Sequence, residues 1–240
     1  MYASSGVMWG LITKPDKLPG CAFLPYFLLG LLWMQRHRAR GWLLCVGSLV
    51  LSWFGGSIEG CVIIGIWAGF WSLQQPKKLH SLLWAGSIGA AGALIISINL
   101  IPLVFHLPLT TRAGGLAFEV GTELSMAPID LFRLLWPHDA SFPFGDISKR
   151  EHYLPTIFIG VSGGLLVLRG VYAASSKRLL WLGVFFFLMA LGKHTPLAMV
   201  MYKVPLLGTI QYPEKYWMGL LPILAYFAAQ GNWSGRRGNW

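Results

Sequence analysis

Charged residues and the common catalytic motifs are what this sequence has least of. Only 12% of its 240 residues are Asp, Glu, Lys or Arg, whereas soluble chains carry about a quarter. There is no Walker A loop, no HExxH and no CxxC pair, so the nucleotide and zinc sites that these motifs mark are not expected. The three cysteines, Cys21, Cys45 and Cys61, lie in or beside apolar runs without metal-ligand spacing and are expected to pack as plain thiols.

Apolar and aromatic residues take the place of charge. Hydrophobic residues make up 55% of the chain, which also holds 12 Trp, 14 Phe and 29 Gly. Aromatic side chains anchor helices at membrane interfaces, and glycine is common in helices that cross a bilayer. The composition therefore predicts an all-α fold, a polytopic bundle of transmembrane helices.

Seven apolar segments alternate with short polar breaks, and each is close to the roughly 20 residues that cross a bilayer. One break, FGGSIEG at 54–60, is rich in glycine and is predicted to turn a helical hairpin. The segments lie at about 21–34, twice within 42–73, and at about 82–105, 154–168, 179–191 and 216–229. We expect about seven spans in a single transmembrane domain over residues 1–240.

The charges are distributed unequally between the two sides of these spans. Strict alternation leaves one side with ten bases and no acid, and the positive-inside rule makes that side, with the C-terminus, cytoplasmic. Its bases are Arg36, Arg38, Arg40, Lys77, Lys78, Arg169, Lys177, Arg178, Arg236 and Arg237. Because short basic clusters between apolar runs encode topology, the net charge of +10 predicts a bilayer partner and no nucleic acid. The expected location is a bacterial inner membrane, crossed several times.

The longest polar interval, residues 106–152, is predicted to be an extracytoplasmic loop with short interfacial helices. It contains six of the nine acidic residues. LAFEVGTEL is expected to form a short helix with Glu119 and Glu123 one turn apart, and PIDLFRLLW a second helix that starts at Pro128. The apolar residues of the second helix would share one face, as in a helix lying flat on a membrane. That face comprises Ile129, Phe132, Leu135 and Trp136.

Carboxylates near the outer face are candidates for acid–base or metal chemistry. Glu59, in the GGSIEG turn, is either an acid or base at the membrane boundary or a solvated turn residue. Five of the loop's six acids and one histidine either hold Mg²⁺ or Mn²⁺ with a diphosphate, or are surface charges. They are Glu119, Glu123, Asp130, His138, Asp139 and Asp146. No metal ligand is assigned from them, and the cofactor stays open.

Basic side chains cluster near the outer face in a region interrupted by Pro196, Pro205 and Pro213. We expect this region to be re-entrant or interfacial. The basic side chains either bind a lipid-linked phosphate, since Lys binds phosphate as a point charge, or extend to the interface by snorkelling. The cations of this region are Lys193, His194, Lys203 and Lys215, and Arg112 and Arg133 offer the same chemistry from the loop.

Several strings, in order, resemble the bacterial YfhO-type membrane proteins of the GT-C glycosyltransferase-like group. They are AFLPYFLLGLL, FGGSIEG, LSMAPIDLFRLLWPHDASFPFG, LGKHTPL and VPLLGTIQYPEKYW, within roughly residues 20 to 230. Two positions depart from the family's pattern: Ile58 stands where it has Pro, and Gln211 where it has Arg. Such proteins carry their catalytic acid in a first outer loop, which this chain is expected to lack as a fragment of a longer core.

The resemblance implies a membrane enzyme that transfers a sugar from a polyprenyl-phosphate-linked donor at the outer face. In this hypothesis Arg112, Lys193, His194 and Lys215 bind the substrate and neutralise its phosphate, and Glu59 or Glu123 acts as acid or base. Two alternatives remain open. One is a transporter or accessory protein for lipids or lipid-linked sugars, and the other is a catalytically inactive membrane remnant.

Overall fold

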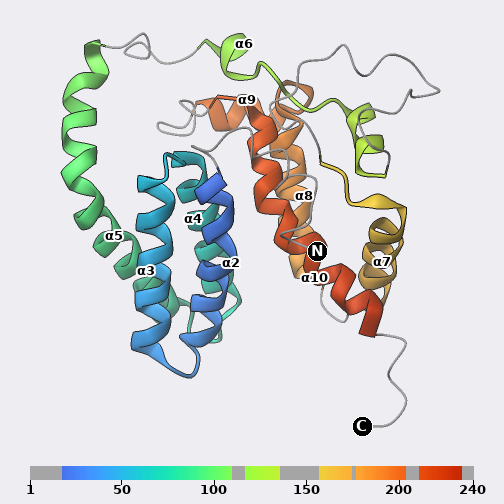
Figure 1. The fold of residues 1–240 in the computed structure, drawn as a ribbon, viewed down its shortest axis with the longest axis horizontal. Helices are drawn as coiled ribbons and strands as arrows, with labels where there is room; N and C mark the ends of the chain where they lie inside the picture. The colour runs from blue at the N-terminus through green and yellow to red at the C-terminus, as the bar shows by residue number, and fades with distance from the viewer. Residues whose placement is uncertain (1–17, 110–116, 136–156, 175–176, 204–210, 234–240) are drawn as a thin grey trace. The chain divides into compact units, whose positions relative to one another are not determined.

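All of the secondary structure in the described part of the chain is helical (Figure 1). The structure, a computed structural model, describes residues 18–109, 117–135, 157–174, 177–203 and 211–233. The predicted all-α class is therefore confirmed. The described residues of Lys14–Gly114 form one compact unit, the N-terminal unit, and those of Gly115–Trp240 form another, the C-terminal unit. The expectation of a single domain stays a prediction.

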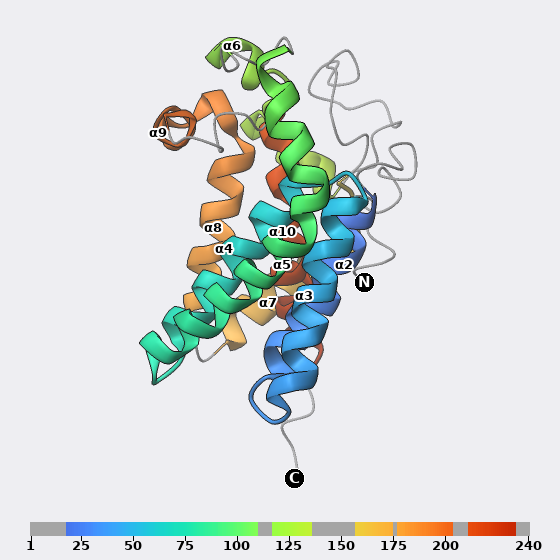
Figure 2. The same ribbon diagram turned by 90° about the vertical axis from the view of Figure 1, so that its left-hand side faces the viewer.

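The N-terminal unit consists of four helices and a short 3-10 turn, η1 (Leu107–Leu109). The helices are α2 (Leu18–Trp33), α3 (Arg38–Phe54), α4 (Ile58–Gln74) and α5 (Lys78–His106). α2 packs against α3 and α4, while α5 crosses both α3 and α4 (Figure 2). The predicted hairpin turn lies between α3 and α4, where Gly56 adopts a φ of +82°, a conformation that glycine adopts readily.

Small residues let the helices of this unit approach each other closely. A Cβ built on Gly41 of α3 would lie 2.6 Å from the Gly30 carbonyl oxygen of α2, and one on Gly30 would lie 2.6 Å from the Cys45 sulfur. Cys45 itself is buried, with its thiol 3.5 Å from the Phe27 carbonyl oxygen that accepts its hydrogen bond. Contacts of small residues with a neighbouring backbone are typical of membrane helices.

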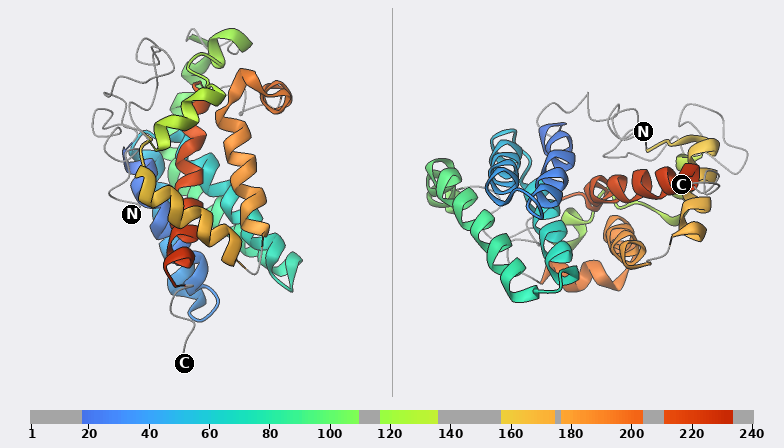
Figure 3. Two further views of the ribbon diagram at one scale, coloured as in Figure 1. Left: turned by 90° about the vertical axis from the view of Figure 1, so that its right-hand side faces the viewer. Right: turned by 90° about the horizontal axis from the view of Figure 1, so that it is seen from below.

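The C-terminal unit is built around α10 (Trp217–Trp233), which packs against α7 (Gly160–Ala173) and α8 (Arg178–Ala190). Figure 3 shows α7 lying across α10. Glycine again permits the contact, because a Cβ on Gly170 would clash with the Phe227 carbonyl and one on Gly231 with the Leu166 carbonyl. The shorter elements are α6 (Phe118–Gly121), η2 (Pro128–Leu134), η4 (Gly192–His194), α9 (Pro196–Tyr202) and η6 (Pro213–Tyr216).

Each of the seven predicted apolar segments contains a helix, but only one helix of the described residues is long and apolar enough to cross a membrane. That helix is α5, with 29 residues, or about 43 Å at 1.5 Å per residue. The other six have 13 to 17 residues, whereas a span needs about 20. Seven spans are therefore not confirmed and stay a prediction.

The apolar side chains of α5 are mostly exposed. Only 17% of its most apolar 18-residue window is buried, and Ile98 and Phe105 are 79% and 77% exposed. The core helix of a soluble protein would bury such residues, because each fully buried large apolar side chain contributes about 1.5–3 kcal/mol. The rest of the N-terminal unit therefore leaves most of the apolar surface of α5 uncovered.

Candidate functional site

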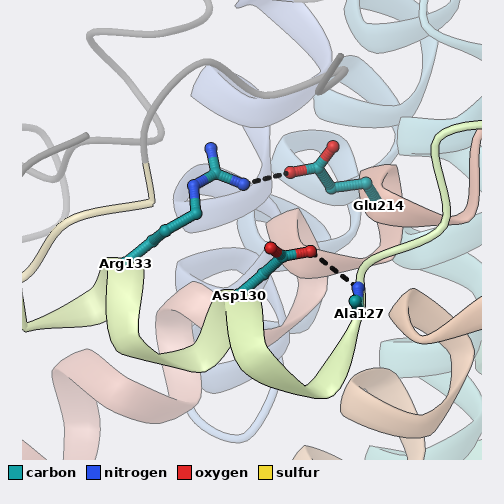
Figure 4. Close-up of polar contacts among 4 residues, drawn as sticks. All are labelled: Ala127, Asp130, Arg133 and Glu214. Atoms are coloured by element: carbon teal, nitrogen blue, oxygen red, sulfur yellow. Dashed lines mark hydrogen bonds and ion pairs between the residues drawn. The ribbon is translucent and has the colours of Figure 1, made fainter. Parts of the chain in front are cut away.

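Three buried charged side chains form a cluster in the C-terminal unit, which we call the η2 cluster: Asp130, Arg133 and Glu214. Asp130 and Arg133 come from consecutive turns of η2, and Glu214 comes from η6, immediately before α10. The guanidinium of Arg133 points toward the carboxylate of Glu214 (Figure 4), with 3.4 Å between Nη1 and Oε1. The relative exposures of Asp130, Arg133 and Glu214 are 0%, 4% and 0%.

Each side chain of the η2 cluster has a structural task. The Oδ2 atom of Asp130 accepts a hydrogen bond from the Ala127 amide at 2.7 Å and so closes the first turn of η2, which begins with Pro128 as predicted. The Arg133–Glu214 pair ties that turn to the start of α10. Buried charges are costly unless they are paired, so the pair favours the arrangement in which η2 lies against η6 within the C-terminal unit.

The exposed residues of η2 are all apolar. Pro128, Ile129, Leu131 and Phe132 are exposed, and Leu135 continues the apolar face just after the helix ends. The two charged residues of the same element are the ones that are buried. The shared face predicted from the sequence thus exists over Ile129, Phe132 and Leu135, while Trp136 lies outside the described residues.

The buried Lys215 lies beside the cluster and faces an aromatic ring. Its Nζ is 5.3 Å from the centroid of the Tyr212 ring, a favourable cation–π distance, and the residue is 5% exposed. Tyr212 has a φ of +67°, rare for a residue other than glycine, and its amide donates to the Gly121 carbonyl oxygen at 3.1 Å. Lys215 therefore acts within the unit and does not present its ammonium at the surface.

Lys193 and His194, which we call the Lys193–His194 pair, are exposed in η4, just after the end of α8. Gly192 precedes them with a φ of +51°, and a Cβ at that position would clash with the Ser125 hydroxyl. The amide of Lys193 donates to the Ser125 Oγ at 3.1 Å, and the Met126 amide donates to the Ala190 carbonyl oxygen at 3.1 Å. The backbone of the pair is thus fixed, while both side chains reach solvent.

Comparison with protein-family models, curated proteins and solved structures found no match. The resemblance to YfhO-type proteins of the GT-C group therefore stays a prediction.

Glu59 is buried in the first turn of α4, at 8% exposure, so the interpretation as a solvated turn glutamate is wrong. The Ser57 Oγ caps this helix by accepting a hydrogen bond from the Gly60 amide at 3.1 Å. A carboxylate in the first turn is stabilised by the helix dipole, which gives Glu59 a structural reason for its place. It belongs to the N-terminal unit, whereas Glu123, Lys193, His194 and Lys215 belong to the C-terminal unit.

The outer-loop carboxylates are only partly described. Glu119 lies in α6 and Glu123 two residues after its end, and both are exposed. Among the residues with described placement, no three His, Cys, Asp or Glu side chains gather as a metal site would require. Arg112 and the remaining loop ligands of the metal hypothesis lie outside the described residues: His138, Asp139 and Asp146.

Sequence reasoning missed Glu214 and the pairing role of Arg133. A clue was available, because Glu214 stands in QYPEKYW, between apolar segments, where a lone acid beside a predicted span needs a partner. A second feature was also missed: Gly160, Ser162 and Gly164 have the spacing of a serine nucleophile elbow. Ser162, however, lies in the first turn of α7, with no strand before it and no hydrogen bond to a histidine among the described residues.

Proposed function

We propose that this chain is an integral membrane protein of glycosyltransferase type that transfers a sugar from a polyprenyl-phosphate-linked donor. The observation that carries the proposal is the exposed pair Lys193 and His194 at the end of the apolar helix α8. A polyprenyl phosphate places its chain in hydrocarbon and its phosphate at the boundary, and the end of an apolar helix lies at such a boundary. An ammonium and an imidazole there offer hydrogen-bond donors to phosphate oxygens.

The exposed apolar surfaces support the membrane part of the proposal. α5 in the N-terminal unit and η2 in the C-terminal unit both present apolar side chains outward. Hydrocarbon around them removes the cost of leaving those side chains in water. The donor's isoprenoid chain would share that environment.

Glu123 is the carboxylate that best fits acid–base chemistry beside the Lys193–His194 pair. It is exposed, and it stands two residues before Ser125, whose hydroxyl contacts the Lys193 backbone. In the proposed reaction the acceptor hydroxyl oxygen bonds to the anomeric carbon, and Glu123 takes the hydroxyl proton. The bond from that carbon to the phosphate oxygen breaks, and Lys193 with His194 stabilises the charge left on the phosphate.

The test is sugar transfer by the purified chain in proteoliposomes that contain a labelled polyprenyl-phosphate sugar and an alcohol acceptor. Lys193→Ala combined with His194→Ala should weaken donor use, and Glu123→Gln should lower the maximal rate. Lys177→Ala is the matched control, because Lys177 is an exposed lysine at the other end of α8. Donor movement across the bilayer without a glycosylated product would favour a transporter and contradict the proposal.

A further inference from the structure

We infer that η2 is an interfacial anchor whose apolar face is inserted among lipid acyl chains. The partner of this surface is the hydrocarbon just below the headgroups. The inference rests on the membrane location in the proposed function but does not need the sugar transfer. It concerns a surface other than the Lys193–His194 pair.

The first argument is the distribution of charge on η2. Its exposed positions carry apolar side chains only, and its two ionisable side chains are withdrawn into the unit, where Asp130 binds the Ala127 amide and Arg133 pairs with Glu214. A polar headgroup layer would tolerate or use charge on this face. Hydrocarbon makes an exposed charge there costly, which agrees with a face that carries none.

The second argument is that this face continues onto α7. The Ile159 amide donates to the Leu134 carbonyl oxygen at 2.8 Å, so η2 is joined directly to the start of α7. Leu135 reaches Gly164, where an added Cβ would lie 2.7 Å from Leu135 Cδ2. The neighbouring α7 residues Val161 and Leu165 are exposed as well. One apolar surface therefore runs from η2 along α7, and one solvent, the acyl chains, would cover it.

Electrostatic attraction to anionic lipids is not the main cause of the proposed insertion of η2. The exposed Glu123 stands just before η2, and the exposed Lys193 is joined to the same segment through Ser125. These two charges are opposite, so binding should depend mainly on apolar contact and change little with salt.

The test places a fluorophore on η2 and measures its depth. Phe132→Cys is labelled with an environment-sensitive probe in a variant with Cys21, Cys45 and Cys61 replaced by alanine, and the full chain is reconstituted in phosphatidylcholine vesicles. Glu119→Cys is the matched control, an exposed position of the same unit. Ile129→Cys gives a second label on the same face in case Phe132→Cys does not fold.

The expected result is blue-shifted emission from positions 132 and 129, strong quenching by brominated lipids and little quenching by aqueous iodide. The label at position 119 should show the reverse. Iodide quenching at 132 and 129 equal to that at 119 would overturn the inference, and so would protection from both quenchers, which would mean that protein covers the face. Because no sugar donor is present, a failure of sugar transfer leaves this measurement unchanged.

Discussion

The ion pair between Arg133 and Glu214 makes the sharpest stability prediction. Arg133→Met removes the guanidinium and keeps an unbranched chain, so the Glu214 carboxylate stays buried without that cation. Removing one partner of a buried pair costs about 3–5 kcal/mol. The 3.4 Å separation is longer than the roughly 2.7–2.9 Å of a strong charged hydrogen bond, so we expect a loss near the lower limit, about 3 kcal/mol.

The double variant separates pairing from general disruption. Glu214→Gln alone should also lower the free energy of unfolding, because it leaves Arg133 buried beside a neutral amide. Arg133→Met combined with Glu214→Gln removes both charges and should cost no more than either single change, since replacing a buried pair by neutral groups is often close to neutral. The coupling free energy in the double-mutant cycle is then at least about 3 kcal/mol, which reaches the upper end of the range for contacting residues.

The assay is equilibrium unfolding of the purified chain in mixed micelles, with the free energy of unfolding measured for the four proteins of the cycle. If the double variant loses as much unfolding free energy as the two single variants together, the coupling is zero and the pairing is refuted. The two side chains would then act independently, and apolar contacts alone would hold η2 to the rest of the C-terminal unit.

Two further predictions use matched variants. Gly41→Ala should lower the free energy of unfolding by about 1–3 kcal/mol more than Gly47→Ala on the same helix α3. The reason is that a Cβ at 41 meets the Gly30 carbonyl, while one at 47 meets nothing within 4 Å. Equal unfolding free energies for the two variants would contradict the close packing of α2 and α3. Burial raises the pKa of Tyr202 from its ordinary 10 to about 12, because the folded protein favours the neutral phenol. The stability that Tyr202 contributes is therefore fully present below pH 10 and is lost as the pH rises to 12. Tyr202→Phe should flatten that part of the pH–stability curve, and an unchanged curve would exclude Tyr202 as its source.

The positions of the helices could be predicted from the sequence because long apolar runs and glycine–proline breaks are local signals. The hairpin at FGGSIEG and the start of η2 at Pro128 both follow from residues within a few positions of each other. Helix ends could not be predicted as well, because hydrophobicity does not show where a helix begins or ends. The segment predicted at about 82–105 is the helix Lys78–His106, and the one predicted at about 216–229 is the helix Trp217–Trp233.

The candidate site was predictable only where a residue's role is local. Lys193 and His194 could be expected near a helix end, since they follow directly on an apolar run. The burial of Glu59, Lys215 and Glu214 depends on packing with other segments, and Arg133 meets Glu214 across 81 positions of the chain. A scan for charge clusters in one loop cannot detect a pair whose members lie so far apart.

The most direct test of the central claim is the affinity of the chain for a polyprenyl phosphate in nanodiscs, measured by native mass spectrometry. Removing a lysine near an anionic lipid surface costs about 1 kcal/mol of binding free energy, or about fivefold in affinity. We predict that Lys193→Ala and His194→Ala each weaken retention of the lipid phosphate, and that Lys177→Ala leaves it unchanged. Equal retention by all of these proteins, or an equal loss in Lys177→Ala, would contradict a phosphate site at the end of α8.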